Sequence, residues 1–368
     1  MKAVWVHGKT QTVKELPIPE PGERQVLIKV VCAAQNPKDW KGAFSRGGEI
    51  CCANGIVPEF MNAPAAVQGS DIAGTIVTVG PGVTRVSPPL LLFTRLTVWQ
   101  FKPGDRVASL YRTGAFAEYA VYPALSTLHI PDSLTYEEAC TLPLGITTAA
   151  MGIFRRLPYH LNTRLTERKT IVVWGASGSV GNYAVQLAKI IGLRVIGVAG
   201  AGIAMAKLAG ADVVVDYRQG QTHAQILEAL EGEELQYSFD AVSEGGTSSA
   251  LASLYSPETK DARMVLVLYP SEELPSFIDY IQTSVFSCYG EEQKFGTRIL
   301  PASPEDNAFA EEFFPWLEEK LREGKIKPNR ITVVPGGLEG VKEGFRRMRE
   351  KDVSGEKLVF RIAETPGL

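Results

Sequence analysis

The sequence predicts an α/β protein with two domains, a mainly antiparallel β domain and a domain built on a doubly wound parallel sheet. Three observations predict this fold class. Up to about residue 130, short β-rich runs alternate with Pro and Gly. From Leu134 the apolar spacing becomes helical, and short apolar runs then alternate with helical stretches. In the middle of the chain, a glycine-rich turn at 175–181 joins a β-branched run to an apolar helix.

The composition is that of an ordinary soluble globular protein. The 368 residues suffice for two domains with real cores, and the net charge is −3 with 21% charged and 45% hydrophobic residues. No basic excess supports a nucleic-acid partner, and no apolar run reaches the roughly 18 residues of a membrane span. The amino terminus lacks the apolar region of a signal peptide.

The cysteines indicate the redox compartment. They are odd in number and irregularly spaced, which is not the pattern of a disulfide framework. We therefore expect free thiols in a reducing compartment and a cytoplasmic protein. The five residues are Cys32, Cys51, Cys52, Cys140 and Cys288.

The first β runs are separated by a Pro- and Gly-rich breaker at 16–22. A polar turn follows, in which Pro37 fixes the backbone and several polar side chains crowd together. Further turns lead into strands. We expect strands at 3–6 and 25–31, within 69–80 and at the end of 101–107, and the start of a further strand at 114–119.

The second half begins with a helix for which Thr135 is the expected N-cap, followed by Glu137 and Glu138 in the first turn. Later runs predict parallel strands at 213–215, 239–242, 264–268 and 284–286, helices at 308–321 and 337–349, and strands at 331–334 and 358–362. The last elements are expected to return to the first domain. The expected division is 1–133 with 301–368 for the β domain and 134–300 for the parallel-sheet domain.

The central unit is a strand at 171–174, a turn, a helix and a strand at 195–198. In the turn, Gly175 allows a sharp bend, Gly178 lets the backbone approach a pyrophosphate, and Gly181 permits close helix–strand packing. The N–H groups at the helix start favour an anion. The alternative is a turn whose glycines serve packing alone. The flanking strand and helix favour the dinucleotide site.

The end of the second strand favours NADPH over NADH. NAD sites usually carry an acidic residue there for the ribose 2′-OH, and none is present between Ala199 and Gly202. No base stands there to pair with a 2′-phosphate either. Lys207 and Arg218 are the candidates, and each could equally be a solvated surface charge.

Seven motifs occur in one order over nearly the whole chain: NPKDWK, GSDIAGTIVTVG, FKPGDRV, GAFAEY, LPLGITTAA, GASGSVG and SGEKLVFRI. Together they resemble the medium-chain dehydrogenase/reductase superfamily, and within it the zinc-independent quinone oxidoreductase and fungal trans-acting enoyl reductase branch. The resemblance implies a GroES-like catalytic domain interrupted by a Rossmann domain, with NADPH in the cleft between them. It also implies hydride transfer to the C=C bond of an α,β-unsaturated carbonyl, either an enone or an enoyl thioester, or to a quinone.

The same resemblance implies the site residues. The cofactor-binding set is Pro37, Trp40, Gly175, Ser177, Gly178, Ser179, Val180, Gly181, Ala199, Gly200, Ala201, Gly202, Tyr217, Val267, Leu268, Lys357 and Leu358. The substrate-binding set is Thr141, Leu142, Gly145, Thr147, Thr148 and Phe286.

The catalytic candidates are Lys38, Asp39 and Thr141. An ammonium or hydroxyl group could stabilise the negative charge that develops on the carbonyl after hydride addition, and Lys41, Thr147 or backbone N–H groups could do the same. Asp39 is either the proton donor or a carboxylate that orients the turn, and water is another proton source.

A zinc site is the alternative that the superfamily suggests. Zinc members use Cys, His–Glu and a further Cys or Asp, whereas Asn36, Gln68, Ser70 and Gly145 stand at the corresponding places here. A tetrahedral site needs three protein ligands besides water. We therefore expect no metal.

Two segments depart from the family pattern, at 42–57 and 86–100. They are either native loop extensions or errors of the gene model. The favoured function is an NADPH-dependent enoyl reductase that acts in trans with a polyketide synthase, as a monomer or homodimer. The alternatives are an NADPH:quinone oxidoreductase and a catalytically silent NADPH-binding protein.

Overall fold

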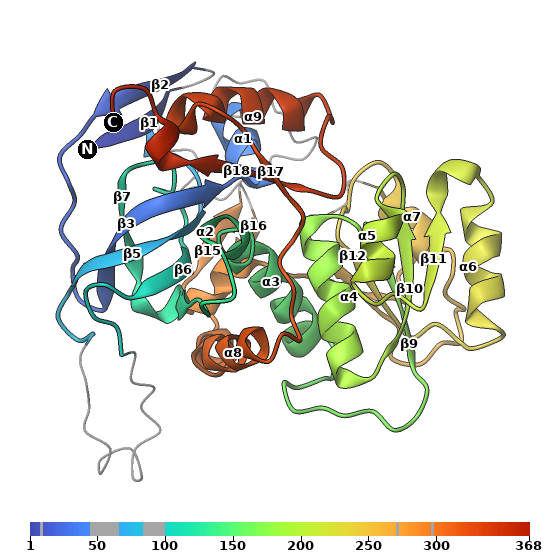
Figure 1. Cartoon of the computed structure of the whole chain (residues 1–368). Coiled ribbons are helices and arrows are strands. Elements are labelled where there is room, and N and C mark those ends of the chain that lie inside the picture. Colours follow the sequence, from blue (N-terminus) through green and yellow to red (C-terminus); the bar gives the residue numbers. More distant parts are fainter. Residues whose placement is uncertain (8–9, 45–65, 84–99, 270–271, 296–297) are drawn as a thin grey trace, which may run out of the picture.

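The computed structural model describes residues 1–7, 10–44, 66–83, 100–269, 272–295 and 298–368. The chain forms two domains, each built on one large β-sheet (Figure 1). This confirms the predicted fold class. The segments 42–57 and 86–100, which depart from the family pattern, lie almost wholly outside the described residues.

The first domain contains a seven-stranded sheet in which neighbouring strands are antiparallel, except for the parallel pair at one edge. The chain's carboxyl end joins this sheet, as expected, because β18 pairs with β3 near the beginning of the chain. A smaller three-stranded sheet, β2-β1-β4, lies beside it (Figure 1). The large sheet has the order β17 (Ile331–Val333), β18 (Lys357–Arg361), β3 (Gln25–Ala34), β5 (Asp71–Val79), β6 (Arg106–Leu110), β8 (Thr127–His129), with β7 (Tyr119–Pro123) on β3. The small sheet is formed by β1 (Lys2–His7), β2 (Thr10–Glu15) and β4 (Ala66–Val67).

The predicted glycine-containing strand is β5, and its glycine has a steric reason. A Cβ on Gly74 would lie 2.1 Å from the backbone oxygen of Lys29 on β3. The register between β3 and β5 shifts beside this point, between Val30 and Cys32. Close backbone approach at a bulge is a usual reason for glycine inside a strand.

The second domain contains the predicted parallel sheet. Its order, β11-β10-β9-β12-β13-β14, is that of a doubly wound dinucleotide fold, with the chain reversal between β9 and β12. The strands are β9 (Thr170–Trp174), β10 (Arg194–Ala199), β11 (Val213–Asp216), β12 (Tyr237–Asp240), β13 (Arg263–Leu266) and β14 (Asp279–Gln282).

Helices cover both faces of this sheet. Val173 and Val195 pack into the cluster that contains α4 (Ser179–Ile191), while Val172 and Ile196 pack with α6 (Thr222–Leu230) and α7 (Thr247–Ala252) on the other face. The shorter α5 (Ile203–Leu208) connects β10 to β11.

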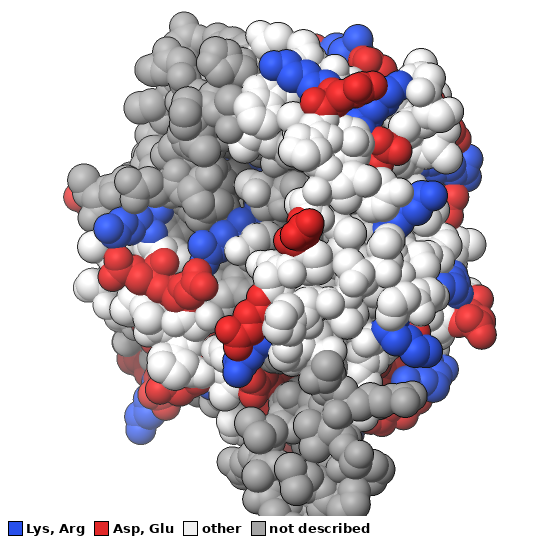
Figure 2. All heavy atoms as spheres, turned by 90° about the vertical axis from the view of Figure 1, so that its left-hand side faces the viewer, with Lys and Arg blue, Asp and Glu red and all other residues white. Residues whose placement is uncertain are grey.

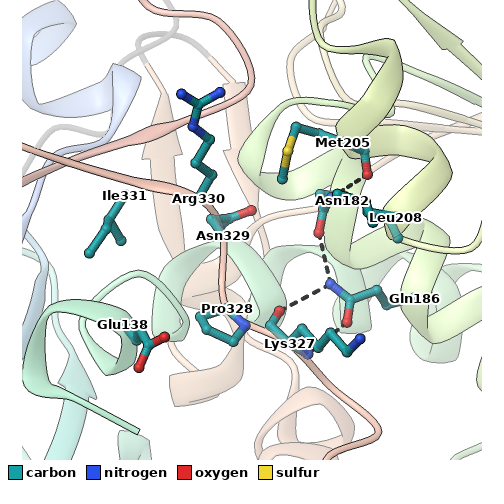
Figure 3. A pocket seen from close by; sticks show the side chains of 11 residues that line it. Glu138, Asn182, Gln186, Met205, Leu208, Lys327, Pro328, Asn329, Arg330 and Ile331 are labelled. Atoms are coloured by element: carbon teal, nitrogen blue, oxygen red, sulfur yellow. Dashed lines mark hydrogen bonds between the residues drawn. The ribbon is translucent and has the colours of Figure 1, made fainter.

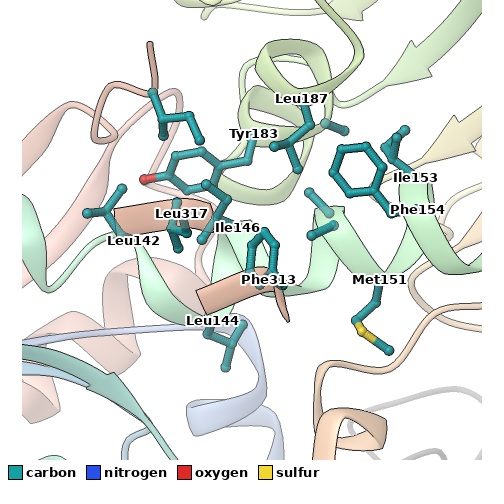
Figure 4. Close-up of a cluster of buried hydrophobic side chains, with 14 of the residues drawn as sticks. Leu142, Leu144, Ile146, Met151, Ile153, Phe154, Tyr183, Leu187, Phe313 and Leu317 are labelled. Atoms are coloured by element: carbon teal, nitrogen blue, oxygen red, sulfur yellow. The ribbon is translucent and has the colours of Figure 1, made fainter. Parts of the chain in front are cut away.

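A buried helix joins the two domains. All eight residues of α3 (Pro143–Ala150) are buried, and the helix continues as a π-helix over Met151–Arg156. Figure 4 shows Leu142 and Ile146 facing Tyr183 of α4, with Phe313 and Leu317 of α8 (Pro304–Arg322) in the same cluster. Because all residues of α3 are buried, the motif LPLGITTAA, which the family resemblance places at the substrate, is held by packing on its neighbours.

The remaining helices belong to the first domain's side. They are α1 (Pro37–Phe44), α2 (Tyr136–Ala139) and α9 (Val341–Arg349). The predicted cap of α2 is confirmed, because Thr135 and Glu138 form a reciprocal capping box.

Two predicted elements are corrected. The predicted strand at 284–286 is wrong, because the last strand of the sheet is β14 and Ser284 leads into a 3-10 helix, Val285–Tyr289. The apolar run reflects burial of Val285 and Phe286 in that turn and not strand pairing. The predicted helix at 337–349 begins as a 3-10 helix, Gly337–Gly340, before α9. A short hairpin of β15 (Gln293–Phe295) and β16 (Arg298–Leu300) follows the corrected segment.

On the face of the first domain that Figure 2 shows, the described residues form no large patch of one charge. Figure 2 shows acidic and basic side chains interleaved on this face, as the net charge of −3 suggests. No helix in the described ranges is long and apolar enough to span a membrane.

Candidate dinucleotide and active site

The glycine-rich turn after β9 forms an open cradle at the start of α4. Gly175 adopts a φ of 75°, and the backbone N–H groups of Gly175 and Ala176 donate to the Val198 carbonyl at 2.9 and 3.0 Å. A Cβ on Gly181 would lie 2.1 Å from the Gly175 oxygen, so α4 packs directly on the turn. Gly178 is the N-cap and offers no side chain to the first N–H groups of the helix. These groups therefore remain available to an anion.

The end of β10 lies beside this cradle. A Cβ on Gly202 would lie 2.4 Å from the Ser177 Cβ, and one on Gly200 would lie 2.6 Å from the Tyr217 hydroxyl. Tyr217 is half exposed above Gly200. Both distances are too short for a side chain, so Gly202 packs directly against Ser177 and Gly200 packs directly against the Tyr217 hydroxyl.

The two basic candidates differ in their surroundings. The Arg218 guanidinium forms a bidentate pair with Asp216, with Nε–Oδ1 and Nη2–Oδ2 distances of 2.8 and 2.7 Å. This hydrogen bonding lowers the pKa of the Asp216 carboxyl to about 2. Lys207 is exposed in the last turn of α5.

A third cation was missed by sequence reasoning. Arg330 lines a cavity of about 350 Å³ together with Met205 of α5 and Asn182 of α4 (Figure 3). Its side chain has no ion-pair partner among the described residues. No signal in the sequence placed it there, because it belongs to the connection between α8 and β17, far along the chain from the turn.

The expected nicotinamide side lies where β12 and β13 end. The buried carboxylate of Asp240 accepts hydrogen bonds from the Val242 and Ser243 N–H groups and from the hydroxyls of Thr247 and Ser248. Ser243 in turn accepts from the Val267 N–H at 3.1 Å. Asp240 was not predicted, and it orders the loop that adjoins Val267 and Leu268. The same loop carries Glu244, which pairs with Lys41 of α1 at 2.7 Å and so joins the two domains.

The Lys38 ammonium lies 5.8 Å from the centroid of the Phe286 ring. It donates to Asp39 Oδ1 at 2.8 Å and to the Arg112 carbonyl at 3.2 Å. Asp39 is fully buried, and its other oxygen accepts the Asn36 N–H at 2.8 Å. The two catalytic candidates of the turn, Lys38 and Asp39, are thus in contact. The Asp39 carboxylate orients both the turn and the lysine.

Lys357 lies in a buried network and not on an open surface. Its ammonium donates to Asn36 Oδ1 at 2.6 Å and pairs with Asp71 at 3.2 Å. Asp71 also accepts from the Asn36 side chain and from the Leu144 N–H, at 2.9 and 2.7 Å. Burial raises the pKa of the Asp71 carboxyl, and Lys357 and the two hydrogen bonds offset part of this rise. The network ties β5, β18 and the start of α3 together.

The threonines of the substrate motif differ in their hydrogen bonding. Thr141 is fully buried and donates to the Glu138 carbonyl at 2.8 Å. Thr148 donates to the Leu144 carbonyl at 2.7 Å. The Thr147 hydroxyl, also buried, has no hydrogen-bond partner among the described residues. An unsatisfied buried hydroxyl is available for a bound ligand.

At the places of the zinc ligands, the described side chains are Asn36, Gln68, Ser70 and Gly145. Within the described ranges, no group of three or more His, Cys, Asp or Glu residues is arranged to hold a metal. Cys51 and Cys52 lie outside these ranges.

A parallel sheet with this strand order, a glycine cradle at a helix start and a second, mainly antiparallel β domain are typical of two-domain dinucleotide-dependent oxidoreductases. Comparisons with known proteins agree. The model of the alcohol dehydrogenase GroES-like domain matches residues 22–132, and that of the zinc-binding dehydrogenase domain matches residues 179–291.

Full-length relatives match both domains at once. The trans-enoyl reductase fsr4 of Gibberella fujikuroi is 31% identical, with 92% of each chain covered. The trans-enoyl reductase resD of Aspergillus sclerotiorum is 29% identical over 96% of this chain and 98% of its own. A mycobacterial protein solved in complex with NADPH has the same fold, with a TM-score of 0.69, 24% identity, and 98% of this chain and 99% of its own covered. The chain belongs to the medium-chain dehydrogenase/reductase superfamily.

Proposed function

We propose that this protein reduces the C=C bond of an α,β-unsaturated carbonyl with NADPH. The observations that carry the proposal are the open cradle at the start of α4 and the lack of an acidic side chain at Ala199–Gly202, where Tyr217 packs on Gly200. An acidic residue there would repel a 2′-phosphate, so its absence favours NADPH. The names of the two fungal relatives support an enoyl substrate, and the NADPH complex of the mycobacterial protein supports the cofactor.

NADPH supplies the hydride when it is bound. The residues that would hold it are the glycine turn with Ser177, Ser179 and Val180 at the pyrophosphate, Ala199, Ala201 and Tyr217 at the adenosine end, and Pro37, Trp40, Val267, Leu268 and Leu358 near the nicotinamide. The substrate would lie against Phe286, Leu142 and Thr148.

Lys38 is the proposed electrostatic group. Its ammonium lies beside Phe286, and a positive charge there stabilises the negative charge that develops on the carbonyl oxygen. Asp39 acts as a positioning residue, because its carboxylate is buried and holds Lys38 at 2.8 Å. The unpartnered Thr147 hydroxyl is proposed as a second donor to the substrate. Thr141, whose hydroxyl is already used, supports the fold of the motif.

The proposed substrate is an enoyl thioester carried by a polyketide synthase, on which this protein acts in trans in the cytoplasm, as a monomer or homodimer. A free enone is the small-molecule equivalent. A quinone bound at the same site would accept hydride from the same cofactor.

The test is a panel of enones, enoyl thioesters and quinones, with NADPH oxidation followed by absorbance. We expect turnover of an enoyl thioester, and Lys38→Met is expected to lower kcat roughly 100-fold because one oxyanion donor is lost. Lys294→Met, at an exposed lysine of the hairpin, is the matched control and should leave kcat unchanged. Turnover of quinones alone would replace the proposal by a quinone reductase. NADPH binding without turnover of any substrate would indicate a silent binding protein.

A further inference from the structure

We propose that Asn329 is a positioning residue for the dinucleotide pyrophosphate, because it fixes the Ser179 hydroxyl as a hydrogen-bond donor toward the anion. The inference rests on the proposed function. It concerns a residue outside the turn, on the connection between α8 and β17, for which the sequence carries no dinucleotide signal.

The Asn329 side chain is buried, 8% exposed, and its amide Nδ2 donates to Ser179 Oγ at 2.9 Å. The same nitrogen faces the Thr141 carbonyl at 3.5 Å. A carbonyl oxygen only accepts, so this contact places the NH₂ group of the amide, and not its oxygen, on the side of Ser179. Ser179 is therefore the acceptor in its bond with Asn329.

The backbone of Asn329 is fixed as well. Its N–H donates to the Tyr183 hydroxyl at 3.2 Å and faces Thr141 Oγ1 at 3.3 Å. Burial raises the pKa of Tyr183, so this phenol stays neutral and can accept. The Asn329 side chain thus cannot swing away from Ser179 without breaking contacts to α4 and to the start of α3.

These contacts leave the Ser179 proton free. A hydroxyl carries one donor, and Ser179 Oγ has no acceptor partner among the described residues. Ser179 is the first residue of α4 after the Gly178 cap, half-buried at the rim of the glycine cradle. A bound pyrophosphate oxygen would supply the missing acceptor, and a hydroxyl held in one orientation pays less ordering entropy to meet it.

The neighbouring helix makes room for this hydroxyl. A Cβ on Gly145 of α3 would lie 2.6 Å from Ser179 Oγ and 3.1 Å from the Tyr183 ring. The glycine of the substrate motif is thus required where α3 passes the pyrophosphate site. Gly145 and Asn329 enclose the Ser179 hydroxyl from two sides.

Gln186 provides a matched control in the same connection. Its side chain accepts from the Lys327 N–H at 2.8 Å and donates to the Lys327 carbonyl at 3.1 Å, as Figure 3 shows for the second bond. It therefore anchors the segment that carries Asn329, but it does not touch Ser179. A variant at Gln186 loosens the segment and leaves the Ser179 hydroxyl with its amide partner.

The experiment measures dissociation constants for NADPH, by nicotinamide fluorescence, and for adenosine 2′-monophosphate, which lacks the pyrophosphate, by calorimetry. Asn329→Ala and Ser179→Ala should each weaken NADPH binding roughly 5- to 20-fold, as expected for one hydrogen bond to a charged group. The double variant should be no weaker than Ser179→Ala alone. Adenosine 2′-monophosphate should bind each variant within about twofold of the wild type, since its contacts do not include the pyrophosphate.

Asn329→Asp is the second variant. Its carboxylate would accept the Ser179 proton and withdraw it from the anion, so NADPH should bind more weakly than to Asn329→Ala. Gln186→Ala should bind NADPH as the wild type does, with a lower Tm.

Equal NADPH affinity of Asn329→Ala and the wild type would overturn the inference. The inference would also fail if Gln186→Ala weakened NADPH binding as much as Asn329→Ala does. It would fail as well if Asn329→Ala weakened the binding of adenosine 2′-monophosphate as much as that of NADPH. Either result would indicate that Asn329 has a structural role only. A wild-type protein that binds no NADPH would refute the proposed function itself, and this inference with it.

Discussion

Two glycines of one turn meet very different surroundings. The Cβ position of Gly181 is occupied by the backbone of Gly175 at 2.1 Å, and a backbone atom cannot rotate away as a side chain can. The Cβ position of Gly178 has its nearest atom at 3.3 Å, and its φ of −74° suits any residue. The turn therefore needs glycine at 181 for packing, while Gly178 is open for a ligand.

Gly181→Ala is accordingly expected to destabilise the fold by about 1–3 kcal/mol, the usual cost of forcing extra volume into a packed site. Urea unfolding followed by circular dichroism measures this change. Gly178→Ala is the control for stability and should lie within about 0.5 kcal/mol of the wild type, apart from any effect on ligand binding. Equal stability of Gly181→Ala and the wild type would contradict the steric assignment.

Residue patterns predicted the turn but not the polar groups that support it. The glycine spacing marks the cradle because each glycine has a local steric reason. Asn329, Arg330 and Asp240 carry no such local signal, since their contacts to the site arise from tertiary packing of distant segments. Lys357 was predicted at the cofactor from the family motif, and its ammonium is engaged with Asp71 and Asn36.

At the scale of elements, β8 and α8 are joined by a histidine between two carboxylates. His129 Nδ1 lies 3.2 Å from Glu318 of α8, and Nε2 lies 3.3 Å from Asp105 in the turn before β6. The ring stacks on Phe101 with a centroid distance of 4.7 Å. The hydrogen bond to Glu318 raises the pKa of His129, burial lowers it in part, and Asp105 raises it further. Lys102 also pairs with Asp105.

The raised pKa makes this contact pH-dependent. A histidine with a higher pKa in the folded state stabilises the fold fully below its unfolded value of about 6.5, and the contribution is lost as the pH rises through the folded value. We expect the unfolding free energy of the wild type relative to His129→Gln to fall by roughly 0.5–1 kcal/mol as the pH rises from about 6 to 8.5, the range of partly exposed ion pairs.

Urea titrations at a series of pH values measure the difference. His223→Gln is the control, because His223 contacts the Ser253 carbonyl and not a carboxylate. The difference in unfolding free energy between His223→Gln and the wild type should stay constant over the same pH range. A constant difference for His129→Gln as well would show that folding does not raise the pKa of His129.

Elements with strong periodicity were predicted well, and those shaped by tertiary contacts were not. The unit β9–α4–β10 and the cap at Thr135 follow from local patterns and are confirmed. The segment at 284–286 has the composition of a strand, but Thr283 donates to the Thr148 carbonyl of α3, and the chain turns beneath that helix. An apolar run alone does not distinguish a buried 3-10 turn from a strand.

At the scale of the whole molecule, the two domains are linked by packing and by charge. The all-buried α3 contacts both, and several ion pairs among the described residues cross between them, including Lys41 of α1 with Glu244 and Arg112 with Glu291. The Lys41 side chain is 13% exposed, so its pair is partly shielded from solvent.

The fold class followed from the alternation of patterns along the chain, because each pattern is local. The way the two domains face each other could not be predicted from these patterns. It depends on how α1, α3 and the connection after α8 pack around the parallel sheet. The proposed preference for NADPH follows from the sequence of the strand end, which lacks an acidic residue at Ala199–Gly202.

The most direct test of the central claim is a titration of the purified protein with NADPH and, separately, with NADH, followed by nicotinamide fluorescence. The account predicts saturable binding of both dinucleotides through the common pyrophosphate cradle, with NADPH bound at least roughly 10-fold more tightly, as one charge-assisted phosphate contact provides. Tighter binding of NADH, or binding of neither, would contradict the assignment of the glycine cradle and the acid-free strand end at Ala199–Gly202.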